Sequence, residues 1–274
     1  MKHKLLSLCT IMFLIPACNL SNPVPPTPTA ETTVVEATAT TDTRGVVTLN
    51  NVSFTLPLGV ADDAQPEMLA ATPGTEADPW WGIAPAHLQF KLTGYQLQGK
   101  TLEPQILVYP AEEFAQMENS PAAAPIERLK NILAGAGVSK DTLPMVGWFN
   151  AGQIFAAHMQ LIDFKSGKGV RFLTQYDQYA APVNNHELVY EFQGLTSDGK
   201  YYVVAVLPVS SSILPEDEKP ESPVPLGGVP LPASVPDASY YDAVTNALDG
   251  MYPDSFNPSL FQLDALIQSI TVTP

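Results

Sequence analysis

The chain of 274 residues contains only two cysteines, and both lie near its start, at Cys9 and Cys18. Residues 19–274 therefore have no disulfide, no thiol nucleophile and no cysteine ligand for a metal. A domain without disulfides depends on its hydrophobic core for stability. The remaining chain is long enough to bury such a core.

Basic residues are also scarce. The sequence has 13 Lys and Arg against 28 Asp and Glu, which gives a formal net charge of −15. Nucleic acids and anionic lipid surfaces are bound by clustered Lys and Arg. This composition therefore disfavours both surfaces, and we expect no nucleic-acid partner.

Common catalytic and cofactor motifs are absent. The sequence has no G-x-S-x-G, no P-loop, no H-E-x-x-H and no dinucleotide fingerprint. Its histidines are too widely spaced to resemble a zinc site. The acidic run at 216–218 lacks the alternating ligands and placed glycine of a calcium loop. The sequence thus predicts no metal and no cofactor, and it favours a non-catalytic protein.

No apolar stretch is long enough to span a membrane. The segment Leu5–Ile15 has about 11 residues, whereas a spanning helix needs ~20. Met1-Lys2-His3-Lys4 precedes this segment and Pro16-Ala17-Cys18 follows it. A basic start, a short apolar stretch and a small residue at the cleavage point describe an export signal.

The cysteine directly after Ala17 resembles the lipobox of bacterial lipoproteins. The resemblance implies that residues 1–17 are a signal peptide, and that Cys18 becomes the lipid-carrying N-terminus. The lipid would hold the protein on the extracytoplasmic side of a cell membrane or an outer membrane. An ordinary secretory signal with an incidental cysteine is the alternative.

Residues 18–44 predict a disordered tether behind that lipid. The stretch is dominated by Pro, Thr, Ala and Glu and has no aromatic residue, so it cannot bury enough apolar surface to offset its ordering entropy. At ~3.1 Å per residue it reaches at most roughly 80 Å. A plain linker is favoured over an O-glycosylated stalk, which the composition also permits.

Residues 45–274 predict one globular domain of the α+β class, an antiparallel β-sheet with helices packed on it. A Pro-rich surface loop is expected at 214–237. Helices are expected after Pro110, at 124–134, after an Asp237 cap, and after an Asn257 cap with Pro258 first. Strands are expected at 46–49, 52–56, 87–92, 105–109, 153–164, 169–178, 187–194, 200–209 and 269–272.

This layout, with the closing segment Leu266-Ile267-Gln268-Ser269-Ile270, loosely resembles the PsbP-like α/β/α sandwich. That sandwich is found in photosystem extrinsic proteins and in some bacterial lipoproteins. The resemblance covers about half of the domain. It implies, as one hypothesis, a structural or assembly role in a membrane complex.

Two predicted hairpins gather polar side chains on one face of the sheet. Pairing 157 with 176, 161 with 172, 190 with 207 and 192 with 205 places seven such residues together: His158, Gln160, Arg171, Gln175, Glu191, Gln193 and Tyr202. The favoured interpretation is the solvated face of an antiparallel sheet. The alternatives are a polar binding surface, or an acid–base site of an exported hydrolase that uses His158 and Glu191 with Arg171 as an anion clamp.

Trp80 and Trp81, between Pro79 and Gly82, are a second candidate site. They could form an exposed aromatic platform for a glycan or a partner, or they could pin a loop to the core. Taken together, the sequence predicts a monomeric, membrane-anchored lipoprotein. Its domain would bind an unidentified protein or small-molecule ligand.

Overall fold

A computed structural model describes residues 43–74, 79–219, 221–232 and 234–274. Cys18, the export signal and almost all of the 18–44 tether lie outside these residues, so lipid attachment stays a prediction. Within the described ranges, every helix is too short or too polar to cross a membrane.

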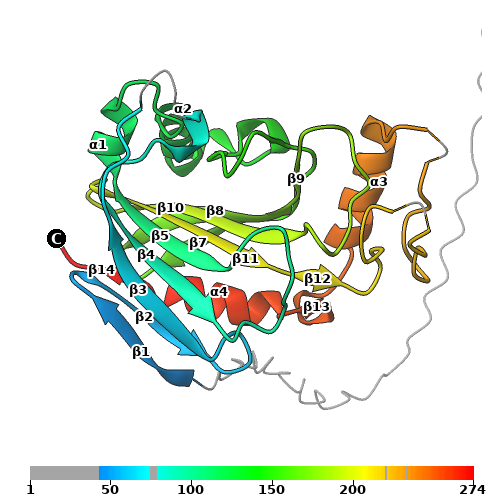
Figure 1. Ribbon diagram of the computed structural model, residues 1–274, viewed down its shortest axis with the longest axis horizontal. Coiled ribbons are helices and arrows are strands. Elements are labelled where there is room, and N and C mark those ends of the chain that lie inside the picture. The colour runs from blue at the N-terminus through cyan, green and yellow to red at the C-terminus, as the bar shows by residue number, and fades with distance from the viewer. Residues whose placement is uncertain (1–42, 75–78, 220, 233) are drawn as a thin grey trace, which may run out of the picture. The chain divides into compact units, whose positions relative to one another are not determined.

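The centre of the domain is a seven-stranded antiparallel sheet (Figure 1) in the order β3-β4-β5-β11-β10-β8-β7. The predicted α+β class is thereby confirmed. The strands of this sheet are β3 (Asp63–Leu69), β4 (His87–Thr93), β5 (Gln105–Pro110), β7 (Ala157–Phe164), β8 (Gly167–Thr174), β10 (Val189–Thr196) and β11 (Tyr201–Pro208).

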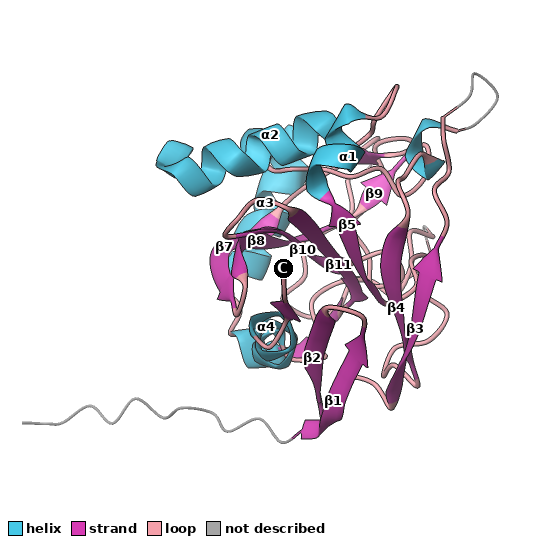
Figure 2. Ribbon diagram, turned by 90° about the vertical axis from the view of Figure 1, so that its left-hand side faces the viewer, coloured by secondary structure: helices cyan, strands magenta, loops and turns pink. Residues whose placement is uncertain are grey.

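Other elements cover both faces of this sheet (Figure 2). Helices α1 (Ala111–Gln116) and α2 (Ala123–Asn131) lie over one face, and α2 continues into a π-turn, Ile132–Ala136. On the other side lie α4 (Leu260–Gln268) and a small sheet of β1 (Thr43–Leu49), β2 (Val52–Pro57) and β14 (Thr271–Val272). Helix α3 (Ala238–Asp249) stands at one end of the central sheet (Figure 1).

The remaining elements are short. The strand β6 (Gly152–Gln153) pairs with β9 (Tyr176–Asp177), and β12 (Ser210–Ser211) pairs with β13 (Phe256–Asn257). Single 3-10 turns lie at Trp80–Gly82, Lys140–Thr142 and Pro253–Ser255. The described part of 214–237 contains no helix or strand.

The sequence-based prediction that this polar sheet face is solvated is wrong. Every residue of β10 is buried, and Glu191, Gln193 and Tyr202 are each 0% exposed. Their face is covered by α1, α2 and the 143–156 segment, which form a second hydrophobic core with Phe172 and Val204. Polar residues at every second position of a strand normally indicate a face exposed to solvent. Here the polar side chains form hydrogen bonds with one another beneath the covering helices and segment.

One predicted hairpin register is confirmed and the other is wrong. In β10–β11, Tyr190 pairs with Leu207 and Phe192 with Ala205, as expected. In β7–β8, Leu161 pairs with Val170 rather than with Phe172. The turn there contains only Lys165 and Ser166, because β8 already begins at Gly167.

The pairing of β8 with β10 decides which polar residues share a face. Phe192 pairs with Arg171, and Glu191 pairs with Phe172. Since paired residues point to the same side of a sheet, Arg171 and Glu191 lie on opposite faces. The sequence-based grouping of these two side chains is therefore wrong.

Most local signals predict the elements correctly. The Asn50-Asn51 turn joins β1 to β2, and the Asp237 side chain caps α3 by accepting from Tyr240 N at 3.2 Å. The predicted Asn257 cap is wrong because Asn257 belongs to β13. Ser259 caps α4 instead, and its Oγ accepts from Phe261 N at 3.3 Å.

Glycines in the central strands make room for two phenylalanine rings. A Cβ on Gly169 would lie 2.6 Å from Phe192 Cε2 and 2.3 Å from the Gln193 carbonyl oxygen. Phe192 in turn meets Phe164 edge to face, with ring centroids 5.9 Å apart. Close packing of this kind leaves no space for a larger side chain.

We predict that Gly169→Val lowers the free energy of unfolding by about 1–3 kcal/mol or more, because it overpacks this contact. Urea unfolding of the full chain measures the change. Gly152→Ala is the control, since a Cβ there meets nothing within 4 Å. Equal stability of Gly169→Val and the wild type would contradict the packing described.

Candidate functional site

Arg171 is the centre of a buried cluster between the sheet and α4. Its side chain is 3% exposed, and Nε lies 3.3 Å from Asp264 Oδ1. Nη2 donates to Gln160 Oε1 at 2.8 Å, and Nη1 donates to the His158 carbonyl. Tyr190 OH donates to Asp264 at 2.8 Å. Arg171 thus joins β7, β8 and β10 to α4. Nη1 and Nη2 donate hydrogen bonds within the fold, whereas the buried Nε has the ion pair with Asp264 but no hydrogen bond.

His158 lies on the same side of the sheet, at an irregularity in β7. Its backbone has φ of 49°, and the pairing register shifts between Ala157 and Gln160. Its Nε2 donates to the Leu248 carbonyl at the end of α3, at 2.7 Å. Burial is the main cause that lowers the pKa of His158, which favours the neutral ring.

Glu191 belongs to a separate cluster on the other face. Its carboxyl oxygens accept from Tyr176 OH at 2.5 Å and from the Gln193 amide. Tyr202 OH donates to Gln193 Oε1. Burial raises the pKa of Glu191 to about 7, against the hydrogen bonds from Tyr176 and Gln193, which lower it.

The structure therefore does not bring His158 and Glu191 together. They lie on opposite faces of the sheet, each bound to neighbours of its own. An acid–base pair must lie within hydrogen-bond reach of the proton it moves. The predicted polar face therefore separates into two structural clusters.

The two tryptophans hold a turn against the rest of the domain. Trp80 is 38% exposed, and its ring meets that of Trp81 edge to face at 5.7 Å. A Cβ added to Gly147 would lie 2.3 Å from Trp80 Cη2, so the ring rests on the segment that covers Glu191. This contact favours the anchoring interpretation.

A groove lies at one end of the sheet, beside Tyr179, and we call it the Tyr179 groove. Its volume is about 520 Å³, larger than two other pockets of about 260 and 200 Å³, and it is a shallow depression that is widely open to solvent. It is lined by Lys140, the segment 152–154, the segment 177–180, Ala238 and Tyr241.

Pairing of β6 with β9 builds the floor of the groove. Gly152 pairs with Asp177 and Gln153 with Tyr176, which sets the Gln153 and Asp177 positions side by side. The opposite wall is the start of α3, where Tyr241 OH donates to the Ala181 carbonyl at 3.0 Å. The segments 152–154 and 177–180 and the start of α3, which are far apart in the sequence, thus lie around the Tyr179 groove.

Gln175, a candidate residue from the sequence, forms a hydrogen bond with Asp177, which lines the groove. It is buried, and its Nε2 donates to Glu187 Oε2 at 2.7 Å and to Asp177 Oδ2 at 3.1 Å. Burial raises the pKa of Asp177 and of Glu187, and nearby Glu218 raises both further. The Tyr179 hydroxyl donates to Glu218 at 2.5 Å.

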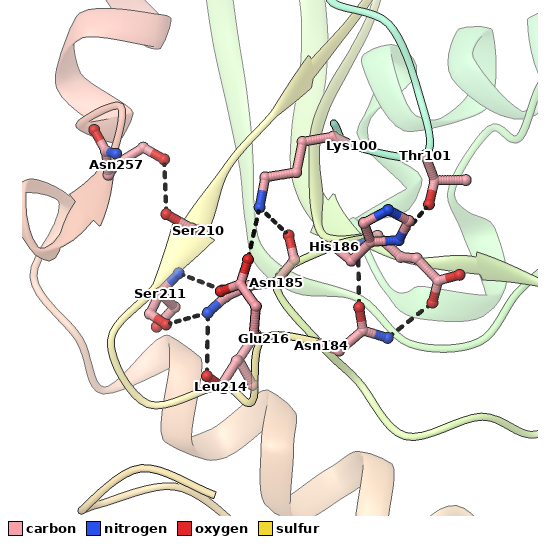
Figure 3. Close-up of polar contacts among 11 residues, drawn as sticks. Lys100, Thr101, Asn184, Asn185, His186, Ser210, Ser211, Leu214, Glu216 and Asn257 are labelled. Carbon is pink, nitrogen blue, oxygen red and sulfur yellow. Dashed lines mark hydrogen bonds and ion pairs between the residues drawn. The ribbon is translucent and has the colours of Figure 1, made fainter. Parts of the chain in front are cut away.

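The Pro-rich loop is fastened beside this network (Figure 3). Asn185 accepts from Ser211 N at 2.8 Å and donates to the Leu214 carbonyl at 3.1 Å. Lys100 Nζ donates to the Asn185 carbonyl at 2.9 Å and lies 3.8 Å from Glu216. These contacts fix the start of the loop that supplies Glu218 to the edge of the groove.

No metal centre is formed in the part of the chain that the structure describes, where no three His, Cys, Asp or Glu side chains are grouped to hold an ion. Comparisons with protein-family models, curated proteins and solved structures found no match for this chain.

Sequence reasoning missed most of the Tyr179 groove, namely Gln153, Asp177, Tyr179 and Tyr241. One signal was present, because Tyr176-Asp177-Gln178-Tyr179 places two polar residues between two tyrosines shortly after a predicted strand. The other members lie more than twenty residues away on either side. Only the folded chain brings them together.

We predict that Arg171→Leu lowers the free energy of unfolding by about 3–5 kcal/mol, because Asp264 would stay buried without its partner. Thermal and urea unfolding measure the loss. Lys168→Ala is the matched control, since it removes an exposed ion pair to Asp163 at 3.4 Å and should cost no more than about 1 kcal/mol. Equal losses in the two variants would refute a structural role for Arg171.

A second prediction concerns pH. Between about pH 4.5 and pH 7 the unfolded chain ionises Glu191, whereas the folded chain keeps it protonated. The unfolded state then binds fewer protons, so the free energy of unfolding falls as the pH rises, by on the order of 3 kcal/mol.

Glu191→Gln should lack this component of the pH dependence, which urea unfolding at a series of pH values measures. Glu67→Gln, at an exposed position on β3, should keep the wild-type profile. Parallel profiles for Glu191→Gln and the wild type would show that Glu191 ionises normally in the fold.

Proposed function

We propose that this chain is an exported lipoprotein, anchored through lipid on Cys18, whose domain is a non-catalytic binding module. The Tyr179 groove is its ligand site. The lipobox-like start supports the anchoring, and the 18–44 segment supports a domain held away from the lipid surface.

The composition of the groove is the observation that carries the binding role. It combines aromatic rings, two glutamine amides, one carboxylate and the Lys140 ammonium, and the residues described along it include no cysteine, serine or histidine. Such a lining can hold a ligand through contacts and hydrogen bonds. It offers no nucleophile with an adjacent base, the pairing that covalent hydrolysis requires.

The hydrolase hypothesis receives less support. It relied on His158, Glu191 and Arg171 acting together, and these residues belong to separate buried clusters. A structural or assembly role in a membrane complex rests on the PsbP-like resemblance alone. Co-purification of the native protein with a larger complex would favour that role over the binding of a small ligand.

Anchoring is tested with Cys18→Ala in a bacterial host. We expect the wild type to incorporate labelled palmitate and to sediment with membranes, and Cys18→Ala to lose both properties because the acceptor thiol is gone. Cys9→Ala should behave as the wild type, since Cys9 lies within the segment that is removed. Full labelling of Cys18→Ala would contradict the proposal.

A further inference from the structure

We infer that the Tyr179 groove binds a neutral, hydroxyl-rich ligand of the carbohydrate class. This inference rests on the proposed binding function and specifies its ligand. Four features of the groove support it: an exposed aromatic ring, mixed donors and acceptors, a rigid support and its charge.

The aromatic surface is supplied by Tyr179, which is 58% exposed. Its hydroxyl is held by Glu218 at 2.5 Å, which restrains the ring while leaving its surface open. The C–H faces of a sugar ring pack against the negative face of such a ring. Tyr241 adds a second ring to the lining.

The polar groups of the groove match hydroxyl chemistry. A hydroxyl both donates and accepts, so it is best met by amides together with a carboxylate. Gln153, Gln178 and Asp177 provide this mixture. Gln153 Nε2 is buried, and no residue in the described ranges gives it a hydrogen-bond partner. Turning that amide toward a ligand would break no existing hydrogen bond of this nitrogen.

The support beneath these groups is already ordered without a ligand. Asp177 is held by Gln175 at 3.1 Å and by Gln178 N at 3.1 Å. Glu187, which also binds Gln175, accepts from Asn184 Nδ2 at 2.8 Å. Preorganisation of this kind lowers the entropy that binding must offset.

Charge disfavours the other ligand classes. Lys140 is the only cation lining the groove among the described residues, while Glu218 lies close enough to raise the pKa of Asp177 and of Glu187. An anionic ligand would be repelled. A cationic ligand would compete with bonds already made, because Glu218 is bound to Tyr179, and Glu187 to Gln175 and Asn184.

Calorimetry with the full chain, in a detergent without a sugar headgroup, tests the inference. The probes are the neutral trisaccharides chitotriose, cellotriose and maltotriose, the polyamine spermine, and the anionic trisaccharide sialyllactose. We expect at least one neutral trisaccharide to bind, and the two charged probes not to bind.

Variants place that binding in the groove. Tyr179→Ala and Gln178→Ala should each weaken it about tenfold or more, because both side chains are exposed contacts. Tyr179→Phe should stay within about threefold of the wild type, since it keeps the ring. Tyr252→Ala, which removes a tyrosine that is 81% exposed elsewhere, should change nothing. Circular dichroism checks that each variant is folded.

The outcomes separate the inference from the proposed function. Neutral sugars that fail to bind, or that bind Tyr179→Ala and Gln178→Ala as tightly as the wild type, overturn the carbohydrate inference. Spermine or sialyllactose binding that is lost in Tyr179→Ala also overturns it, while upholding a binding role for the groove. If neither variant changes the binding of any probe, the binding role proposed for the groove fails together with the carbohydrate inference, while anchoring through Cys18 is tested separately.

Discussion

Burial of the central sheet on both faces is the constraint on which the rest of this structure depends. The strands β8, β10 and β11 have no solvated side, so each polar side chain on them needs a partner inside the protein. Arg171 forms an ion pair with Asp264, and Glu191 accepts hydrogen bonds from Tyr176 and Gln193. Side chains that resemble a reactive surface in the sequence are therefore part of the packing.

Because both faces of the central sheet are buried, the candidate site lies at the end of the sheet. Surface that remains open lies where β9, the 140–154 segment and the start of α3 meet, and loops there can present side chains without losing core contacts. Gln175 connects the two regions, because it is buried and yet holds Asp177 in the groove. Fold and site are thus linked through one hydrogen-bonded side chain.

Local signals in the sequence predicted much of the fold. The Asp198-Gly199 turn fixes the β10–β11 register, and Asp237 begins α3. Long-range features could not be read in this way. The pairing of β8 with β10 depends on no turn, and β3, which contains Pro66, has a largely exposed pattern that resembles a loop. The Tyr179 groove draws on residues from 140 to 241, and no local pattern joins them.

Carboxyl labelling of the folded full chain with a carbodiimide and an amine, read residue by residue by mass spectrometry, tests the central claim directly. Reaction at each carboxyl reports its access to solvent. The account predicts that Asp177 and Glu218 at the groove are labelled, whereas Glu191 and Asp264 are protected until the protein unfolds. Labelling of Glu191 as fast as Asp177 would show that the sheet face is open, and the account would then be wrong.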